Sequence, residues 1–98
     1  MEYSFCVEVD YLVPVDGRII PVEVKSGAAG RLRSLMQFLD KSEERCGVRL
    51  YAGSHSLDSV TTFHAKPFRL LNIPYYHAAK LPEYVRMLCP SSDNPTVR

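Results

Sequence analysis

The sequence has few cysteines and almost no net charge, and each shortage excludes a class of protein. Twelve basic residues against eleven acidic ones leave a formal charge of +1, so the chain lacks the general cationic surface of a protein that coats nucleic acid. Cys6, Cys46 and Cys89 are far apart and form no C-x-x-C pair, which indicates neither a disulfide framework nor a zinc knuckle. We expect reduced thiols in a cytoplasmic protein.

Long hydrophobic runs and metal-binding motifs are also missing. Polarity alternates over the first dozen residues and no basic leader precedes them, so we expect neither a signal peptide nor contact with a membrane. The three histidines, His55, His64 and His77, show no ligand spacing with one another or with cysteine. What is present, 46% hydrophobic and 23% charged residues in 98, is typical of one globular domain with a small core.

Two alternating segments predict a β-hairpin at the start of the chain. Apolar and polar residues alternate from Tyr3 to Val13 and again from Ile19 to Lys25, with the β-branched and aromatic residues that strands favour. The Asp16-Gly17 pair between them favours a type I′ turn. With these two residues as the loop, the facing pairs are Val9–Val24, Tyr11–Val22, Val13–Ile20, Asp10–Glu23 and Glu8–Lys25. A slip of one residue would oppose valines to carboxylates.

A helix and a third strand follow. Leucines and a methionine recur at i, i+3, i+4 and i+7, which predicts an amphipathic helix from about Arg31 to Glu44, ended by Gly47; the stripe is Leu32, Leu35, Met36 and Leu39. The next strand is expected over residues 48–52, parallel to the second. We therefore predict an α/β fold, a mixed sheet with an N-terminal antiparallel hairpin and a β-α-β crossover.

The second half of the chain is less regular. We expect a loop over residues 53–58, short strands at 60–63 and 68–71, and helices that begin near Pro74 and Pro82, the second running from Glu83 to Leu88. The domain should span residues 1–89, followed by a polar, disordered tail over 90–98.

Asp10, Glu23 and Lys25 are predicted to share one polar face of the hairpin. Directly opposed carboxylates repel each other, so either one keeps its proton or a cation lies between them. Mg²⁺ or Mn²⁺ would suit two carboxylates, and a neighbouring lysine could orient a phosphate or an attacking water. The alternative is a solvated surface with weak Glu8–Lys25 and Asp10–Arg18 ion pairs.

Several stretches together resemble one protein family. They read EVDYLV, IIPVEVKSG, SLMQFL and RLLNIPYYHAAKL, within residues 5–81. They resemble the C-terminal domain of a prokaryotic family of AAA-type ATPases, a domain described mostly as of unknown function and similar in fold to the PD-(D/E)xK nuclease superfamily. The resemblance implies a restriction-endonuclease-like core in which Asp10 is the first metal-binding acid, Glu23 the second and Lys25 the lysine of the E-x-K motif.

Two departures from that family shape the functional expectation. Nucleases of the superfamily often carry a further acid on a helix before these strands, whereas this chain begins at the strand itself. It also has no G-x-x-x-x-G-K-[ST] motif, and hence no nucleotide site of that kind. We expect a nuclease-like domain, incomplete at its N-terminus, that serves an ATPase domain as a non-catalytic interaction or substrate-engaging module. The alternative is a divalent-metal phosphodiesterase acting on DNA or RNA with Asp10, Glu23 and Lys25 as catalytic residues.

Two further expectations concern binding partners. Arg31 and Arg33 lie near the start of the predicted helix, where they could contact nucleic-acid phosphates or could be plain surface charges. An incomplete domain leaves apolar surface uncovered, which favours a homodimer through a sheet edge or through the tyrosine-rich C-terminal region.

Overall fold

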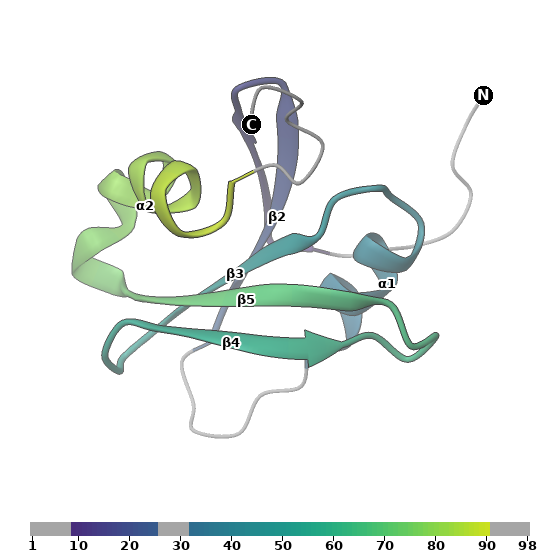
Figure 1. The fold of residues 1–98 in the computed structure, drawn as a ribbon. Helices are drawn as coiled ribbons and strands as arrows, with labels where there is room; N and C mark the ends of the chain where they lie inside the picture. Colours follow the sequence, from purple (N-terminus) through teal and green to yellow (C-terminus); the bar gives the residue numbers. More distant parts are fainter. Residues whose placement is uncertain (1–8, 26–31, 91–98) are drawn as a thin grey trace.

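Five strands form one mixed sheet with helices on both of its faces (Figure 1). The computed structural model describes residues 9–25 and 32–90. The strands are β1 (Tyr11–Val15), β2 (Arg18–Val24), β3 (Cys46–Tyr51), β4 (Ser56–Thr61) and β5 (Pro67–Pro74), in the order β1-β2-β3-β5-β4. β2, β3 and β5 are parallel, whereas β1 and β4 run antiparallel to their neighbours at the two edges. The predicted α/β class, hairpin and crossover are confirmed.

The hairpin has the predicted turn and register. Asp16 and Gly17 both have positive φ, 54° and 83°, as a type I′ turn requires. Tyr11 pairs with Val22 and the ladder continues from there to the turn. Residues 3–8 of the predicted strand lie outside the described residues; Val9 and Asp10 are described but are not in the strand, and the ladder begins at Tyr11. It ends there because the Val24 N–H, which would have continued it, donates instead to the Asp10 carboxylate.

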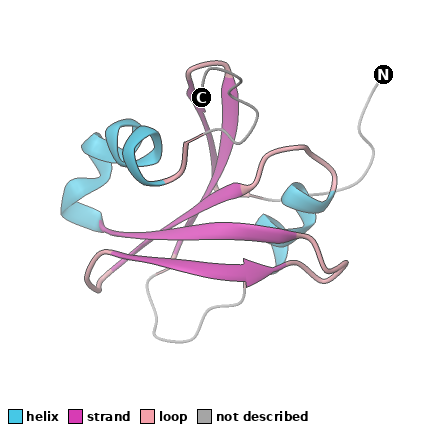
Figure 2. Cartoon of the chain, in the orientation of Figure 1, coloured by secondary structure: helices cyan, strands magenta, loops and turns pink. Residues whose placement is uncertain are grey.

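The crossover helix α1 (Arg33–Asp40) packs on one face of the sheet through the predicted stripe (Figure 2). Leu35 and Leu39 are fully buried, and they contact Phe68 and Leu70. The helix stops at Asp40 rather than near Glu44. The Asp40 carboxylate accepts a hydrogen bond from the Thr62 hydroxyl at 2.5 Å and lies 2.8 Å from His64 Nδ1, so the end of α1 is tied to the β4–β5 turn.

The prediction that Gly47 ends the helix is wrong. It lies in β3, directly under Leu35, where an added Cβ would come within 2.7 Å of the leucine Cδ2 atom. The glycine therefore allows α1 to approach the sheet closely, and the missing side chain serves packing between layers rather than helix termination.

Two features of the second half differ from the sequence prediction. Ser56, Leu57 and Asp58 belong to β4 rather than to a loop, because they pair with β5 along the backbone. The side chains of Ser56 and Asp58 also accept hydrogen bonds from the Asn72 amide. The strand predicted at residues 68–71 is longer and forms β5. The two predicted helices are present as the 3₁₀ helix η1 (Tyr75–Lys80), after Pro74, and α2 (Leu81–Leu88), with Pro82 in its first turn.

The second face of the sheet carries the larger core. Leu81 and Val85 of α2 pack there with apolar side chains of four strands, among them Val22, Val48 and Ile73. The thiols of Cys46 and Cys89, distant in sequence, meet in this core; their mutual hydrogen bond and burial raise the pKa of Cys46. Within residues 9–25 and 32–90, no helix is long and apolar enough to span a membrane.

Gly47→Ala should lower the free energy of unfolding by about 1–3 kcal/mol, because the new methyl group overpacks the α1–β3 contact. Leu35→Ala should cost about 2–5 kcal/mol by leaving a cavity. In the double variant the methyl group enters the space that the leucine vacated. The double variant should therefore lose less unfolding free energy than the sum of the losses in the two single variants. Urea denaturation of the four proteins measures this, and strictly additive losses would contradict the described packing.

Candidate functional site

Glu23 and Lys25 leave β2 on the face that α1 covers. Lys25 Nζ lies 3.4 Å from Glu23 Oε1, and the Glu23 side chain is only 7% exposed. Burial raises the pKa of Glu23, the neighbouring lysine opposes this, and the negative charge of Asp10 adds to it. For Glu23 the interpretation as a solvated surface charge is therefore wrong: it forms a buried ion pair.

Asp10 reaches Glu23's neighbourhood through the backbone rather than through strand pairing. Its Oδ2 accepts a hydrogen bond of 2.8 Å from the N–H of Val24, the residue between Glu23 and Lys25. The structure thus brings the three predicted residues to the same end of the hairpin. Arg18, the alternative partner of Asp10, instead holds Glu44, with its Nη2 2.6 Å from Oε2. Glu8 lies outside the described residues.

A row of polar residues continues across the sheet from Glu23. The strand register places Glu23 beside Arg49, Arg49 beside Asn72 and Asn72 beside Ser56. Arg49 Nε donates to Asn72 Oδ1 at 2.7 Å, and Asn72 Nδ2 donates to Ser56 Oγ at 2.8 Å and to Asp58 Oδ2 at 2.9 Å. We call these five residues the polar row.

The polar row is not predicted by the sequence patterns, although one residue in the sequence points to it. Asn72 interrupts the apolar run of β5 and is 1% exposed, and a buried amide needs partners for its donors and its acceptor. Those partners come from β3 and β4, so only the assembled sheet identifies them. Arg49 also lies over the ring of Tyr51, 5.2 Å from its centroid, which holds the guanidinium against the face of the sheet.

The two acids fit an oxygen-ligated divalent cation in donor chemistry and in charge. Asp10 and Glu23 supply carboxylate oxygens, the ligands that Mg²⁺ and Mn²⁺ prefer. A cation there would offset both the burial and the negative charge that raise the pKa of Glu23. Among the residues that the structure describes, no three histidine, cysteine, aspartate or glutamate side chains lie close enough together to hold a metal. A cation bound by Asp10 and Glu23 would thus have two protein ligands and would keep most of its water.

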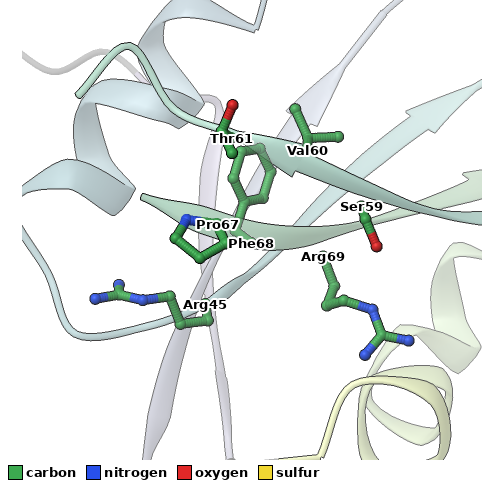
Figure 3. A pocket seen from close by; sticks show the side chains of 7 residues that line it. All are labelled: Arg45, Ser59, Val60, Thr61, Pro67, Phe68 and Arg69. Atoms are coloured by element: carbon green, nitrogen blue, oxygen red, sulfur yellow. The ribbon is translucent and has the colours of Figure 1, made fainter. Parts of the chain in front are cut away.

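The arginines predicted to bind nucleic acid are not brought to the polar row by any described contact. Arg31 lies outside the described residues, and Arg33 is exposed at the first residue of α1. Two other arginines, Arg45 and Arg69, line a hollow of about 330 Å³ at the opposite end of the sheet, together with Ser59, Val60, Thr61, Pro67 and Phe68 (Figure 3). Their guanidinium groups point in different directions, and that of Arg45 donates to the carbonyls of Ser42 and Glu44.

The pH dependence of stability should report the buried Glu23. Because the pKa of Glu23 is raised in the folded state, the folded protein binds a proton at this carboxylate more tightly than the unfolded chain does. The protonated carboxyl group therefore favours folding at low pH, and this contribution to stability is lost as pH rises through the folded-state pKa. Glu23→Gln removes the charge, so its free energy of unfolding should rise relative to wild type as the pH is raised above about 4.

Thermal or urea denaturation across this range measures the difference. The exposed Glu43 provides the matched control, since Glu43→Gln should follow the wild-type profile. If Glu23→Gln instead loses stability against wild type as pH rises, the ion pair with Lys25 outweighs the burial of the carboxylate.

The sequence matches the model of one protein family. The model of a family described as a domain of unknown function (DUF4143) matches residues 5–71, more than half of the chain. The match includes Asp10, Glu23, Lys25, α1 and Arg49, whereas Asn72, η1 and α2 lie beyond it. Searches of curated proteins and of solved structures gave no significant match. The chain therefore belongs to the DUF4143 family.

Proposed function

We propose that this chain is a nuclease-like module that serves an AAA-type ATPase as a substrate-engaging or interaction domain and does not itself hydrolyse phosphodiesters. The observation that carries the proposal is the buried Glu23–Lys25 pair. In an E-x-K nuclease the acid binds a metal and the lysine acts on phosphate or water. Here the two groups neutralise each other, and the Asp10 carboxylate is engaged by the Val24 amide.

The arrangement of elements supports the nuclease-like part of the proposal. An antiparallel hairpin carries the E-x-K residues on its second strand, and a crossover helix leads to a parallel third strand. This is the arrangement that the sequence resemblance to the PD-(D/E)xK superfamily implies. Resemblance of fold does not by itself imply activity, so activity depends on the residues of the site. Free, buried thiols at Cys46 and Cys89 agree with a place in the cytoplasm.

The polar row supports the substrate-engaging part. Arg49 provides a cation on this face of the sheet, and Asn72 fixes its guanidinium group through the amide oxygen. A phosphate group is the natural ligand for a fixed guanidinium group. We propose that this face contacts the phosphodiester backbone of DNA or RNA.

A second function, divalent-metal phosphodiesterase activity, is favoured by one observation. The pKa of Glu23 is raised by burial and by Asp10 despite the adjacent lysine, a perturbation of the kind found at functional sites. A cation between the two acids would release Lys25 for a role beside the scissile phosphate.

Cleavage of fluorescent single- and double-stranded DNA and RNA oligonucleotides in millimolar Mg²⁺ or Mn²⁺ separates the two functions. Under the main proposal, wild type and Lys25→Ala leave the oligonucleotides intact, while Arg49→Gln weakens oligonucleotide binding severalfold. Metal-dependent cleavage by wild type that is lost in both Lys25→Ala and Asp10→Asn would establish the phosphodiesterase instead. Co-elution of the chain with an ATPase module of the resembling AAA-type family tests the proposed partner.

Paired thermal melts test the cation site by itself. Without metal, Asp10→Asn should leave the free energy of unfolding unchanged or raise it by about 1 kcal/mol or less, because it removes a repulsion and keeps an acceptor for the Val24 amide. With millimolar Mg²⁺ or Mn²⁺, wild type should gain stability and Asp10→Asn should not. Equal responses to metal in the two proteins would mean that Asp10 and Glu23 hold no cation.

We further propose that the chain dimerises through the edge strand β1. Three large apolar side chains are exposed on the hairpin, Tyr11 at 60%, Leu12 at 51% and Ile19 at 45%, and an uncovered edge with apolar side chains favours pairing with a second copy. Light scattering at micromolar concentration should give a dimer for wild type and a monomer for Leu12→Lys. A monomeric wild type would show the prediction to be wrong.

A further inference from the structure

Three ring side chains from separate elements meet where β3 and β5 end. His55 lies in the β3–β4 turn, His77 in η1 and Tyr84 in α2. His55 Nε2 is 3.0 Å from His77 Nδ1, and the Tyr84 hydroxyl is 3.4 Å from the same Nδ1. The imidazole rings stack with their centroids 4.8 Å apart, and the Tyr84 ring lies 4.8 Å from that of His55.

Two imidazole nitrogens 3.0 Å apart are joined either by one N–H···N hydrogen bond or by a cation that both bind. A neutral imidazole carries one N–H and one lone pair, so the contact holds either a single shared proton or a cation that both lone pairs bind. Nitrogens bound to one metal at roughly 2.0–2.1 Å lie about 2.8–3.4 Å apart when the angle at the metal is about 90–110°. The distance of 3.0 Å between His55 and His77 falls within that range.

We infer that His55, His77 and Tyr84 form a binding site for one late transition-metal ion, Ni²⁺, Cu²⁺ or Zn²⁺. Imidazole nitrogen is a preferred ligand of these three ions, whereas Mg²⁺ prefers carboxylate oxygen. The site is therefore chemically distinct from the pair of acids on the hairpin. His55 is exposed and His77 half-buried, so water has access to the remaining coordination positions, and the phenol oxygen of Tyr84 supplies a third donor.

Such an ion would add a direct link among three segments, of which α2 already packs on the sheet through Leu81 and Val85. It would join the β3–β4 turn to η1 and to α2. The first residue of η1, Tyr75, also donates a hydrogen bond from its hydroxyl to the backbone carbonyl of Lys25. The metal therefore holds the helix that contacts the end of β2, next to the proposed substrate face.

Isothermal titration with NiCl₂ and with ZnCl₂ tests the inference on the whole chain. Wild type should bind one ion, and His55→Gln and His77→Gln should each weaken binding at least tenfold. His64 is the matched control: it lies in the β4–β5 turn at the other end of the sheet, against Asp40, so His64→Gln should bind as wild type does. Asp10→Asn should also leave this binding unchanged, which separates the site from the proposed function.

A spectroscopic measurement keeps the inference testable should a variant fold poorly. The electron paramagnetic resonance spectrum of Cu²⁺ bound to wild type should show coupling to two imidazole nitrogens. Equal Ni²⁺ affinity in wild type and His55→Gln, or a copper spectrum without nitrogen coupling, would overturn the site and leave the pair as a hydrogen bond that shares one proton.

Discussion

The register of β2 is the constraint on which the other contacts depend. Its residues alternate between two environments: Val22 and Val24 face the core under α2, while Glu23 and Lys25 face the side that α1 covers. A shift of one residue would place a carboxylate in the apolar core and expose the valines. The same register aligns Glu23 with Arg49, and through β3 it positions Asn72 and Ser56. The polar row is thus a consequence of how one strand pairs.

The parts of the fold that the sequence predicts are those set by local rules. The type I′ turn at Asp16-Gly17 and the alternation on both sides of it determine the hairpin register, and the stripe through Leu35 and Leu39 determines the buried side of α1. Each of these involves neighbours along the chain or across one tight turn.

The parts that escaped prediction depend on distant partners. Gly47 resembles a helix stop until Leu35 is placed above it, and Ser56 and Asp58 resemble loop residues until Asn72 is placed beside them. The same reason applies to the candidate site. The E-x-K spacing indicated Glu23 and Lys25, but the burial of Glu23, the Asp10–Val24 hydrogen bond and the contribution of Arg49 require three assembled strands.

The mixed strand order also sets the sequence in which the chain folds. The β1–β2 hairpin closes a two-residue loop, whereas Val22 pairs with Val48, 26 residues further along, and Cys46 pairs with Arg69, 23 residues further along. Loop-closure entropy opposes these parallel pairings before any of their contacts form, and local hairpins form within microseconds. The strand that carries the E-x-K residues therefore acquires its register early, while the neighbours that supply Arg49 and Asn72 join it late. Until they do, the Glu23 carboxylate stays in water, so its desolvation belongs to the last stage of folding.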